Sequence, residues 1–333
     1  MTVILEADTI TKKYGNVEVV HGISFQVEEG EIFGLLGPNG AGKTTSISML
    51  TGLFPPTSGR ATIGGYDIQK EPLKAKQITG LVPQDLALYP TLSARANLTF
   101  FGRVYGLRGT DLKERVNDVL HIVGLADRAD EAIEKYSGGM KRRINIAAGL
   151  VHQPRLLFLD EPTVGVDPQS RNHIFESVMK LNRERGMTII YTSHYMEEVQ
   201  LLCNRVAIID MGNLVALDTI KNLVAILGGG VIQIGLNKVD DRTLAELGAL
   251  PSVKAAGLAP VAAPLPAAAG ADGGVPATSP ISVVKIEAID SRQALVEVIN
   301  YCNERDIPVV SLETLEPNLE SVFLHLTGKK LRE

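Results

Sequence analysis

The 333-residue sequence lacks any long apolar run. A helix that spans a bilayer needs roughly 20 consecutive apolar residues. The best candidate, residues 223–236, is shorter and contains a run of three glycines and Gln233. The start of the chain, where Glu6 and Asp8 follow soon after Met1, has neither the basic beginning nor the apolar core of a secretory signal peptide. We therefore expect a cytoplasmic protein that would need another chain to span any membrane at which it works.

The sequence also contains few cysteines and carries no excess of positive charge. Cys203 and Cys302 are the two cysteines, and their spacing matches no metal-binding or redox motif, which predicts two reduced thiols. The formal net charge is −5, whereas a protein that binds nucleic acid regardless of sequence carries a basic face. No nucleic-acid partner is therefore expected. The length and the 45% hydrophobic content instead predict two or more folded domains.

The most informative feature that is present is a complete phosphate-binding motif. It comprises Gly37, Pro38, Asn39, Gly40, Ala41, Gly42, Lys43, Thr44 and Thr45. The apolar run 32–36 before it predicts a buried strand, and 46–53 after it predicts a helix. A glycine-rich turn there points backbone N–H groups and the positive end of the helix dipole at phosphates. Lys43 is expected to reach the β- and γ-phosphates and Thr44 to bind Mg²⁺, so the motif predicts binding of a nucleoside triphosphate.

A second motif is an apolar strand, 155–159, that ends in Asp160 and Glu161. Taken alone, two acids at the end of a strand are more often a solvated pair. In a chain with a complete phosphate-binding loop, they fit catalysis better. Asp160 is then expected to hold Mg²⁺, and Glu161 to polarise the water that attacks the γ-phosphorus.

A third motif runs from Tyr136 to Arg143 and contains Ser137, Gly138 and Gly139. The serine can cap a helix that continues through Ala148. The glycine N–H groups at such a helix start also form a phosphate site. Because one domain rarely needs two γ-phosphate sites, the second one suggests that it completes the site of another copy.

The order of predicted elements indicates an α/β fold. Strands at 3–14 and 18–27 are expected to pair around a turn at Gly15. Further strands are predicted at 32–36, 61–63, 80–82, 155–159 and 188–192, with helices at 46–53, 169–185 and 196–203. Strands that alternate with helices favour a mostly parallel sheet covered on both faces. The helical pattern at about 93–151 interrupts this alternation and predicts a helical subdomain.

The three motifs, in this order, resemble the nucleotide-binding subunit of an ABC (ATP-binding cassette) transporter over about residues 3–220. The resemblance implies a P-loop NTPase cassette with an antiparallel β subdomain and an inserted helical subdomain. It also implies four further site residues: Tyr14, which stacks on adenine; Gln84, which contacts Mg²⁺ and water and relays to the membrane partner; Asp167, which crosses the dimer interface; and His194, which contacts the γ-phosphate. Taken singly, each of the four also fits an ordinary turn, loop or cap residue.

The third motif departs from the family pattern at two positions. The usual signature is Leu-Ser-Gly-Gly-Gln, and here Tyr136 and Met140 replace its first and last residues. Because Met140 cannot form the amide hydrogen bonds of glutamine, slower or altered turnover is expected. The form Ser-Gly-Gly-Met-Lys-Arg-Arg resembles the branch of bacterial drug- and polysaccharide-type exporters in which the ATPase and the membrane subunits are separate chains. Within it, the daunorubicin- and multidrug-exporter type is the one that this chain resembles.

The resemblance further implies partners and a mechanism. Two copies are expected to form a head-to-tail dimer around two Mg·ATP, each nucleotide lying between the P-loop of one chain and Ser137–Gly139 of the other. A separate polytopic transmembrane permease would hold this dimer at the cytoplasmic face of the cell membrane, seated near Gln84. Leu86, Leu88, Tyr89 and Leu92 either line that seat or belong to the core of the subdomain.

Two other classes of ABC ATPase remain as alternatives to a transporter subunit. Cytosolic members that act on ribosomes usually carry two cassettes, whereas this chain has one P-loop and one signature. Members that act on DNA place a long coiled coil inside the cassette, and this sequence has no sustained heptad run. Both alternatives therefore fit less well.

The C-terminal third predicts a separate small domain. After a possible hinge at 228–230, residues 231–236, 242–248, 253–258, 281–289, 291–305 and 309–315 read as strand, helix, strand, strand, helix and strand, which suggests a ferredoxin-like unit. The run 259–280 is rich in alanine, proline and glycine and predicts a flexible insertion. Residues 317–328 resemble the tail helix of daunorubicin-exporter-like ATPases. The domains are accordingly expected at 1–225, the cassette, and 226–333, an accessory or regulatory α+β domain.

Overall fold

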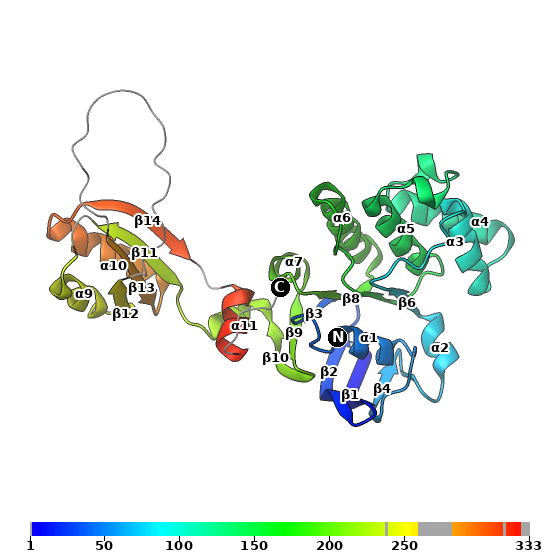
Figure 1. Ribbon diagram of the computed structural model, residues 1–333, viewed down its shortest axis with the longest axis horizontal. Helices are drawn as coiled ribbons and strands as arrows, with labels where there is room; N and C mark the ends of the chain where they lie inside the picture. The colour runs from blue at the N-terminus through cyan, green and yellow to red at the C-terminus, as the bar shows by residue number, and fades with distance from the viewer. Residues whose placement is uncertain (1, 237–238, 259–281, 316–317, 328–333) are drawn as a thin grey trace. The chain divides into compact units, whose positions relative to one another are not determined.

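The computed structural model describes residues 2–236, 239–258, 282–315 and 318–327 (Figure 1). The described chain separates into two compact units. The first contains the residues up to Ile220 and those from Leu326 on, and the second contains Lys221–His325. The predicted insertion at 259–280 lies outside the described residues.

A six-stranded sheet forms the centre of the first unit. Its strands, in spatial order, are β10 (Asn213–Thr219), β9 (Arg205–Asp210), β3 (Ile32–Leu36), β8 (Thr188–Ser193), β7 (Leu156–Leu159) and β6 (Thr79–Val82). The five strands from β9 to β6 run parallel, and β10 pairs antiparallel with β9. This confirms the predicted mostly parallel sheet.

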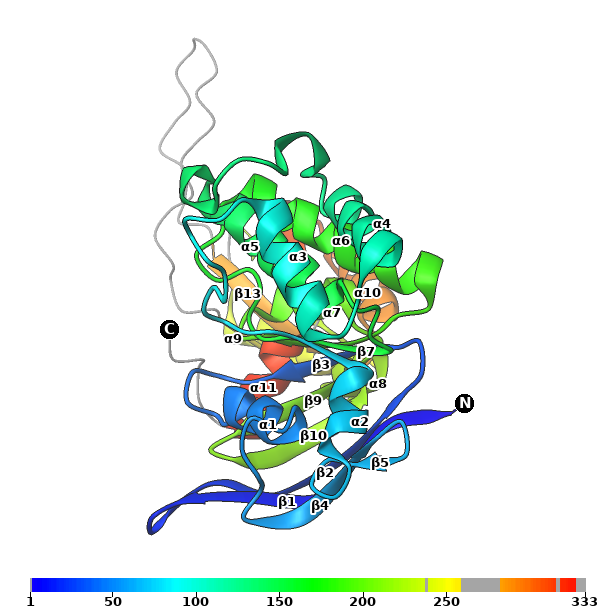
Figure 2. The ribbon, with the colours of Figure 1, turned by 90° about the vertical axis from the view of Figure 1, so that its right-hand side faces the viewer.

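The two faces of the sheet are covered by different layers. Along β7, Leu157 and Leu159 pack into one apolar cluster, while Leu156 and Phe158 pack into another, because successive side chains of a strand point to opposite faces. The first cluster joins the sheet to four helices, α3 (Ala94–Val104), α4 (Gly109–Ile122), α5 (Gly138–Leu150) and α6 (Pro168–Arg185). The short 3-10 turns η1 (Ala126–Arg128) and η2 (Ile133–Lys135) lie between α4 and α5. Figure 2 shows these helices on one side of the sheet and α1 with the β1–β2–β4 layer on the other.

The second layer is an antiparallel sheet with the order β2 (Val17–Glu28), β1 (Val3–Tyr14), β4 (Ser58–Ile63) and β5 (Tyr66–Asp67). Helix α1 (Lys43–Leu50) packs between the layers, and α2 (Pro72–Gln77) and α7 (Met196–Leu202) complete the unit. Helix α1 starts three residues earlier than the sequence predicts. The reason is that Gly42, in a left-handed conformation, ends the loop and lets Lys43 enter the first turn directly.

The register of the parallel strands aligns their carboxyl ends. Leu36 lies opposite Ser193, Leu159 opposite Tyr191, and Val82 opposite Leu159. The loops that leave these strands therefore emerge along one edge of the sheet. Binding sites of parallel sheets lie at this edge.

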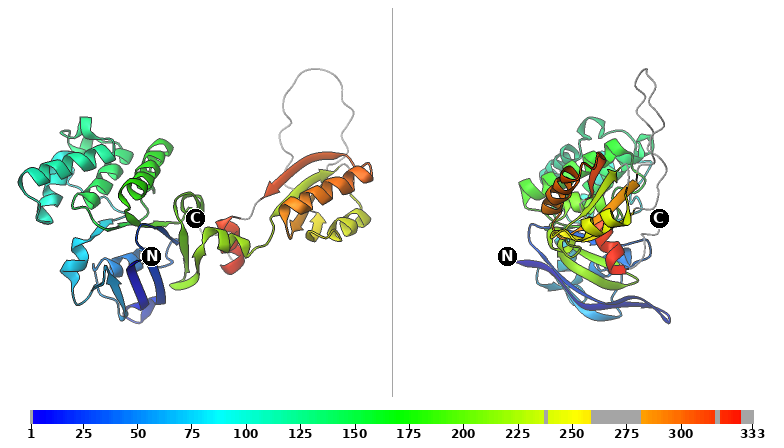
Figure 3. Two further views of the ribbon diagram at one scale, coloured as in Figure 1. Left: turned by 180° about the vertical axis from the view of Figure 1, so that it is seen from behind. Right: turned by 90° about the vertical axis from the view of Figure 1, so that its left-hand side faces the viewer.

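The second unit is an antiparallel sheet with the order β12 (Val253–Leu258), β13 (Ser282–Ala288), β11 (Val231–Leu236) and β14 (Val309–Leu315). Helices α9 (Asp241–Gly248) and α10 (Ser291–Glu304) cover one face of it (Figure 3). Helix α8 (Ile220–Ala225) precedes the sheet and α11 (Leu319–Thr327) follows it. The βαββαβ order matches the predicted ferredoxin-like arrangement.

Helix α11, in the region of the predicted tail helix, buries Leu319, Val322 and Phe323, and Leu326 is half-buried. Across the residues that the structure describes, none of the helices is both long and apolar enough to cross a bilayer.

Candidate active site

The P-loop lies between β3 and α1 and has the backbone that its glycines permit. Gly40 and Gly42 have φ values of 80° and 104°, which side chains strongly disfavour. A Cβ on Gly37 would collide with the carbonyl oxygen of Ile209. Lys43 Nζ donates to the carbonyl oxygens of Gly37 and Pro38 at 2.7 and 3.1 Å. The loop therefore folds back over its own lysine.

The carboxylate of Glu161 is the centre of the site. Lys43 Nζ lies 3.1 Å from Oε1, and His194 Nδ1 lies 3.4 Å from the same oxygen. Gln84 Nε2 donates to Oε2 at 3.3 Å. These residues come from four loops that follow β3, β7, β8 and β6. Lys43 and Glu161 are almost completely buried, with 4% and 6% of their side chains exposed, so their attraction is weakly screened by solvent.

Asp160, beside Glu161, has the surroundings of a cation ligand. Thr192 Oγ1 donates to Asp160 Oδ1 at 2.8 Å, and the hydroxyl of Thr44 is also hydrogen-bonded to this carboxylate. Burial raises the pKa of Asp160, while those two hydroxyls oppose the rise. A buried carboxylate next to a hydroxyl provides the hard oxygen donors that Mg²⁺ prefers. The residues present therefore fit Mg²⁺.

The signature segment combines an exposed helix start with a tightly packed glycine. Ser137 caps α5 by accepting a hydrogen bond from Met140 N at 3.2 Å, and Ser137 and Gly138 are exposed. Gly139 is buried, and a Cβ there would collide with Ser170 of α6. Asp167 caps α6 through Ser170 N at 2.9 Å, and this backbone N–H lowers the pKa of Asp167. The structure thus brings Asp167 and the signature glycine together.

Both departures from the usual signature contact the same side chain. The Tyr136 hydroxyl donates to the carbonyl oxygen of Arg128 at 2.6 Å, and the Arg128 guanidinium lies 5.5 Å from the Tyr136 ring centroid. Arg128 Nη1 also lies 3.4 Å from the Met140 sulfur. Arg128 in turn pairs with Glu131. Tyr136 and Met140 therefore act as two parts of one packed cluster.

Tyr14 and three of the four residues of the predicted permease seat lie at the surface. Tyr14 is half exposed and meets Phe54 edge-on, with Lys12 Nζ above the Phe54 ring at 4.4 Å from its centroid. Leu86, Tyr89 and Leu92 are exposed, at 43%, 48% and 40%, whereas Leu88 packs against the core of the helical subdomain. Of the two alternatives for this segment, packing in the subdomain fits Leu88, whereas the exposed Leu86, Tyr89 and Leu92 fit a seat for the permease.

Several residues of the site were not predicted from the sequence. Thr192 holds Asp160 and accepts a hydrogen bond from Glu161 N at 2.8 Å. Arg142 donates from Nη1 to the carbonyl oxygens of Pro83 and Gln84 at 3.1 and 2.7 Å, which fixes the loop after β6. Arg142 stands within the signature motif, so its position was visible in the sequence, but the direction of its side chain was not.

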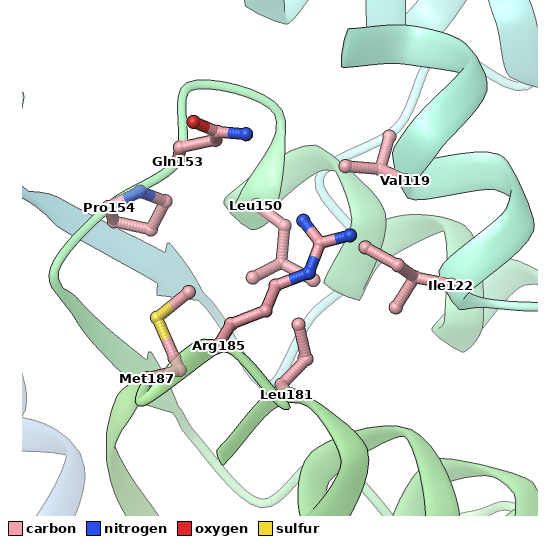
Figure 4. Close-up of a pocket in the computed structure, with 8 residues that line it drawn as sticks. All are labelled: Val119, Ile122, Leu150, Gln153, Pro154, Leu181, Arg185 and Met187. Atoms are coloured by element: carbon pink, nitrogen blue, oxygen red, sulfur yellow. The ribbon is translucent and has the colours of Figure 1, made fainter. Parts of the chain in front are cut away.

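A hollow of the first unit lies away from this chemistry. It has a volume of about 430 Å³ and is lined by Val119, Ile122, Leu150, Gln153, Pro154, Leu181, Arg185 and Met187 (Figure 4). Pro154 and Met187 come just before β7 and β8, so the hollow opens at the amino ends of these strands. The P-loop and Glu161 follow the carboxyl ends. The hollow is therefore separate from the cluster of residues around Glu161.

Known proteins resemble this chain over nearly its whole length. A model of the ABC transporter family matches residues 20–164. The linearmycin resistance ATP-binding protein LnrL of Bacillus subtilis (strain 168) is 47% identical over 331 residues, covering 99% of this chain and 100% of that protein. The daunorubicin resistance ATP-binding protein DrrA2 of Streptomyces coeruleorubidus is 36% identical over 326 residues, covering 98% and 95%.

A solved structure agrees with the fold of the first unit. cbiO1 from Clostridium perfringens, described as part of the ABC transporter complex cbiONQ, matches with a TM-score of 0.62 at 30% identity, covering 68% of this chain and 92% of that one. These matches confirm the resemblance that the three motifs indicate. The chain therefore belongs to the ABC transporter family, as an ATP-binding subunit with ATPase activity.

Proposed function

We propose that this chain is the energy-coupling subunit of a drug-type exporter and works with a separate transmembrane permease at the cytoplasmic face of the membrane. Two similar proteins are named for resistance to linearmycin and daunorubicin, and the likeness to them extends through the C-terminal domain. In this proposal the cassette, residues 1–225, carries the chemistry. The domain 226–333 has an accessory or regulatory role.

The observation that carries the catalytic part of the proposal is the convergence of Lys43, Gln84 and His194 on the Glu161 carboxylate, all within 3.4 Å. Glu161 is the general base, which accepts the proton of the attacking water. Lys43 and His194 neutralise charge on the γ-phosphate, where electrostatic stabilisation provides most of the catalysis. As Lys43 moves its contact from Glu161 to the phosphates, the carboxylate becomes available to the water.

The nucleotide site that we propose uses the P-loop backbone for the phosphates and Tyr14 for adenine. Thr44, Gln84 and Asp160 would hold Mg²⁺, which supplies charge neutralisation to the β- and γ-phosphates when bound. The P-loop contributes Gly37, Pro38, Asn39, Gly40, Ala41, Gly42, Lys43, Thr44 and Thr45.

A second copy of the chain would complete each site. Ser137 and Gly138 are exposed at the start of α5, where free backbone N–H groups favour an anion. We propose that Ser137, Gly138 and Gly139 contact the γ-phosphate held by the other copy, with Asp167 at the interface. ADP lacks this contact, so hydrolysis would open the dimer.

Substitution of the base tests the catalytic part. We expect Glu161→Gln to abolish hydrolysis while an ATP-bound dimer accumulates, because the amide keeps the shape of the side chain but cannot accept the proton. Phosphate release and size-exclusion chromatography with ATP measure the two effects. Substantial remaining turnover would remove Glu161 as the base.

Affinity purification from gently solubilised membranes tests the transport part. A stoichiometric polytopic partner, identified by mass spectrometry, is the expected result. Recovery with ribosomes or nucleic acid instead would contradict the transport role and leave the ATP site intact.

A further inference from the structure

A buried carboxylate behind the active site has a role that the mechanism above does not use. Glu198 lies in the first turn of α7 and is only 3% exposed. Its oxygens accept hydrogen bonds from three hydroxyl groups. Thr163 Oγ1 donates to both carboxylate oxygens of Glu198, at 2.8 and 2.9 Å. Ser193 Oγ and the Tyr191 hydroxyl donate to Oε2, at 2.9 and 3.0 Å.

These hydroxyls belong to the loop that carries Glu161 and to strand β8, which leads directly to His194. Thr163 follows Glu161 by two residues in the loop after β7. Ser193 ends β8 and directly precedes His194, and its Oγ also accepts the backbone N–H of Tyr195 at 2.9 Å. One side chain therefore joins the segment of the proposed base to the segment of the proposed γ-phosphate contact.

The segment of Glu161 needs such support because its backbone is strained. Glu161 has a φ of 47°, a conformation that is uncommon for a residue with a side chain. On its amino side, Glu161 N is held by Thr192 Oγ1 at 2.8 Å. On its carboxyl side, the next side-chain anchor is the bond from Thr163 to Glu198. The strained residue is thus fixed from both directions.

The chemistry of the contacts favours a carboxylate at this position. An ionised carboxylate accepts only, so it fixes the direction of all three hydroxyl donors, and charge-assisted hydrogen bonds are stronger than neutral ones. Arg171 Nε lies 3.7 Å from Glu198 Oε1, beyond hydrogen-bond distance. An amide in place of the carboxylate would bring two donors toward three hydroxyls and would leave their directions undetermined.

We propose that Glu198 is a positioning residue for ATP hydrolysis, which fixes Glu161 and His194 relative to each other without touching the nucleotide. The inference rests on the roles proposed above for these two residues. It predicts that Glu198 affects the chemical step and leaves nucleotide affinity unchanged, because the P-loop and Tyr14 lie outside its contacts.

The test compares kcat and KM for ATP in the full-length protein. We expect Glu198→Gln to lower kcat by roughly tenfold or more, since small misplacements of catalytic groups are costly, while KM changes by less than about twofold. Glu197→Gln is the matched control, because Glu197 is the exposed neighbour on the same helix and should retain wild-type kcat.

A second pair of variants tests the contact itself. Thr163→Val keeps the shape of the side chain and removes the hydroxyl, whereas Thr163→Ser keeps the hydroxyl. We expect the valine variant to lose kcat as Glu198→Gln does and the serine variant to retain most of it. If the hydroxyl of Thr163 had a purely structural role, the valine and serine variants would not differ in kcat alone but also in thermal stability.

The outcomes distinguish this inference from the proposed function. Wild-type kcat in Glu198→Gln, or a parallel loss of nucleotide binding and thermal stability, would overturn the positioning role. If Glu161→Gln is inactive while Glu198→Gln is active, only the positioning role fails. If Glu161→Gln is active, the assigned base is wrong and the inference falls with it.

Discussion

At the scale of single residues, the signature segment differs from the family pattern at two positions that share one neighbour. Tyr136 and Met140 replace the leucine and glutamine of the usual signature, and both contact Arg128. Met140 is only 9% exposed, so its side chain is turned into the cluster. The signature segment of this chain is therefore packed against Arg128, and it has no side-chain amide at position 140.

Restoring the amide is a direct test of this difference. We expect Met140→Gln to raise kcat by roughly fivefold with unchanged KM, because one added hydrogen bond contributes about 1 kcal/mol. A steady-state ATPase assay measures both constants. Lys141→Gln, the same replacement at the next position, should have no effect. A lower kcat in Met140→Gln would show that the contact between Met140 and Arg128 matters more than the amide.

At the scale of elements, His152 joins three parts of the first unit. This residue follows α5, and its ring stacks on Tyr105 at the end of α3 with ring centroids 3.6 Å apart. Its Nε2 donates to the carbonyl oxygen of Thr79 in β6 at 3.0 Å. Burial lowers the pKa of His152 to about 4. The helical subdomain and the sheet are thus linked through an imidazole that is neutral in the folded protein.

This linkage predicts a loss of stability in mild acid. The folded pKa is below the unfolded value of about 6.5, so stability is complete above that pH and falls as the unfolded chain binds a proton. Between pH 7.5 and 5.5 the loss is roughly 1 kcal/mol in the free energy of unfolding. Urea unfolding at both pH values should show this loss in the wild type and not in His152→Gln.

Carboxylates also bind protons on acidification, so the comparison with His152→Gln isolates the contribution of the imidazole. The glutamine can still donate to Thr79. Equal pH dependence in both proteins would mean that His152 keeps an ordinary pKa in the folded state.

At the scale of the whole molecule, the two units have separate cores. The apolar cluster of the second unit includes residues of β11, α9, β13 and α10, and the loops with Lys43, Glu161 and His194 belong to the first unit. Leu258 of β12 lies opposite Val284 of β13, so the strands on either side of the segment 259–280 are antiparallel neighbours. Closing this pair does not require a long connection, since loops of two to five residues join hairpin strands.

Deletion of residues 259–280 tests whether this segment is needed for folding or activity. The shortened chain keeps three residues between Leu258 and Val284, a length that hairpins accept. We expect ATPase activity within about twofold of the wild type and an unchanged unfolding midpoint, because no residue of the site is removed. Activity assays and thermal melting measure the two quantities. A collapse of either would show that the segment is structural.

Much of this protein is determined by its sequence alone. The three motifs predict the loops of the site, because each motif encodes a local backbone: glycines for a tight turn, an apolar run for a buried strand, a serine for a helix cap. Periodicity likewise predicts the parallel sheet, the helical block and the βαββαβ order. These features depend on residues that are close together in the chain.

Only the tertiary structure decided which distant residues meet. Glu198 and Thr163 are 35 residues apart and Arg142 and Gln84 are 58 apart, yet each pair is hydrogen-bonded. Neither contact leaves a periodic or local signal in the sequence. They follow from the strand order β3–β8–β7–β6, which brings four carboxyl ends into one row, and from the helices that pack on it. The sequence therefore determined the parts of the site, and the packing of the sheet determined how those parts are held together.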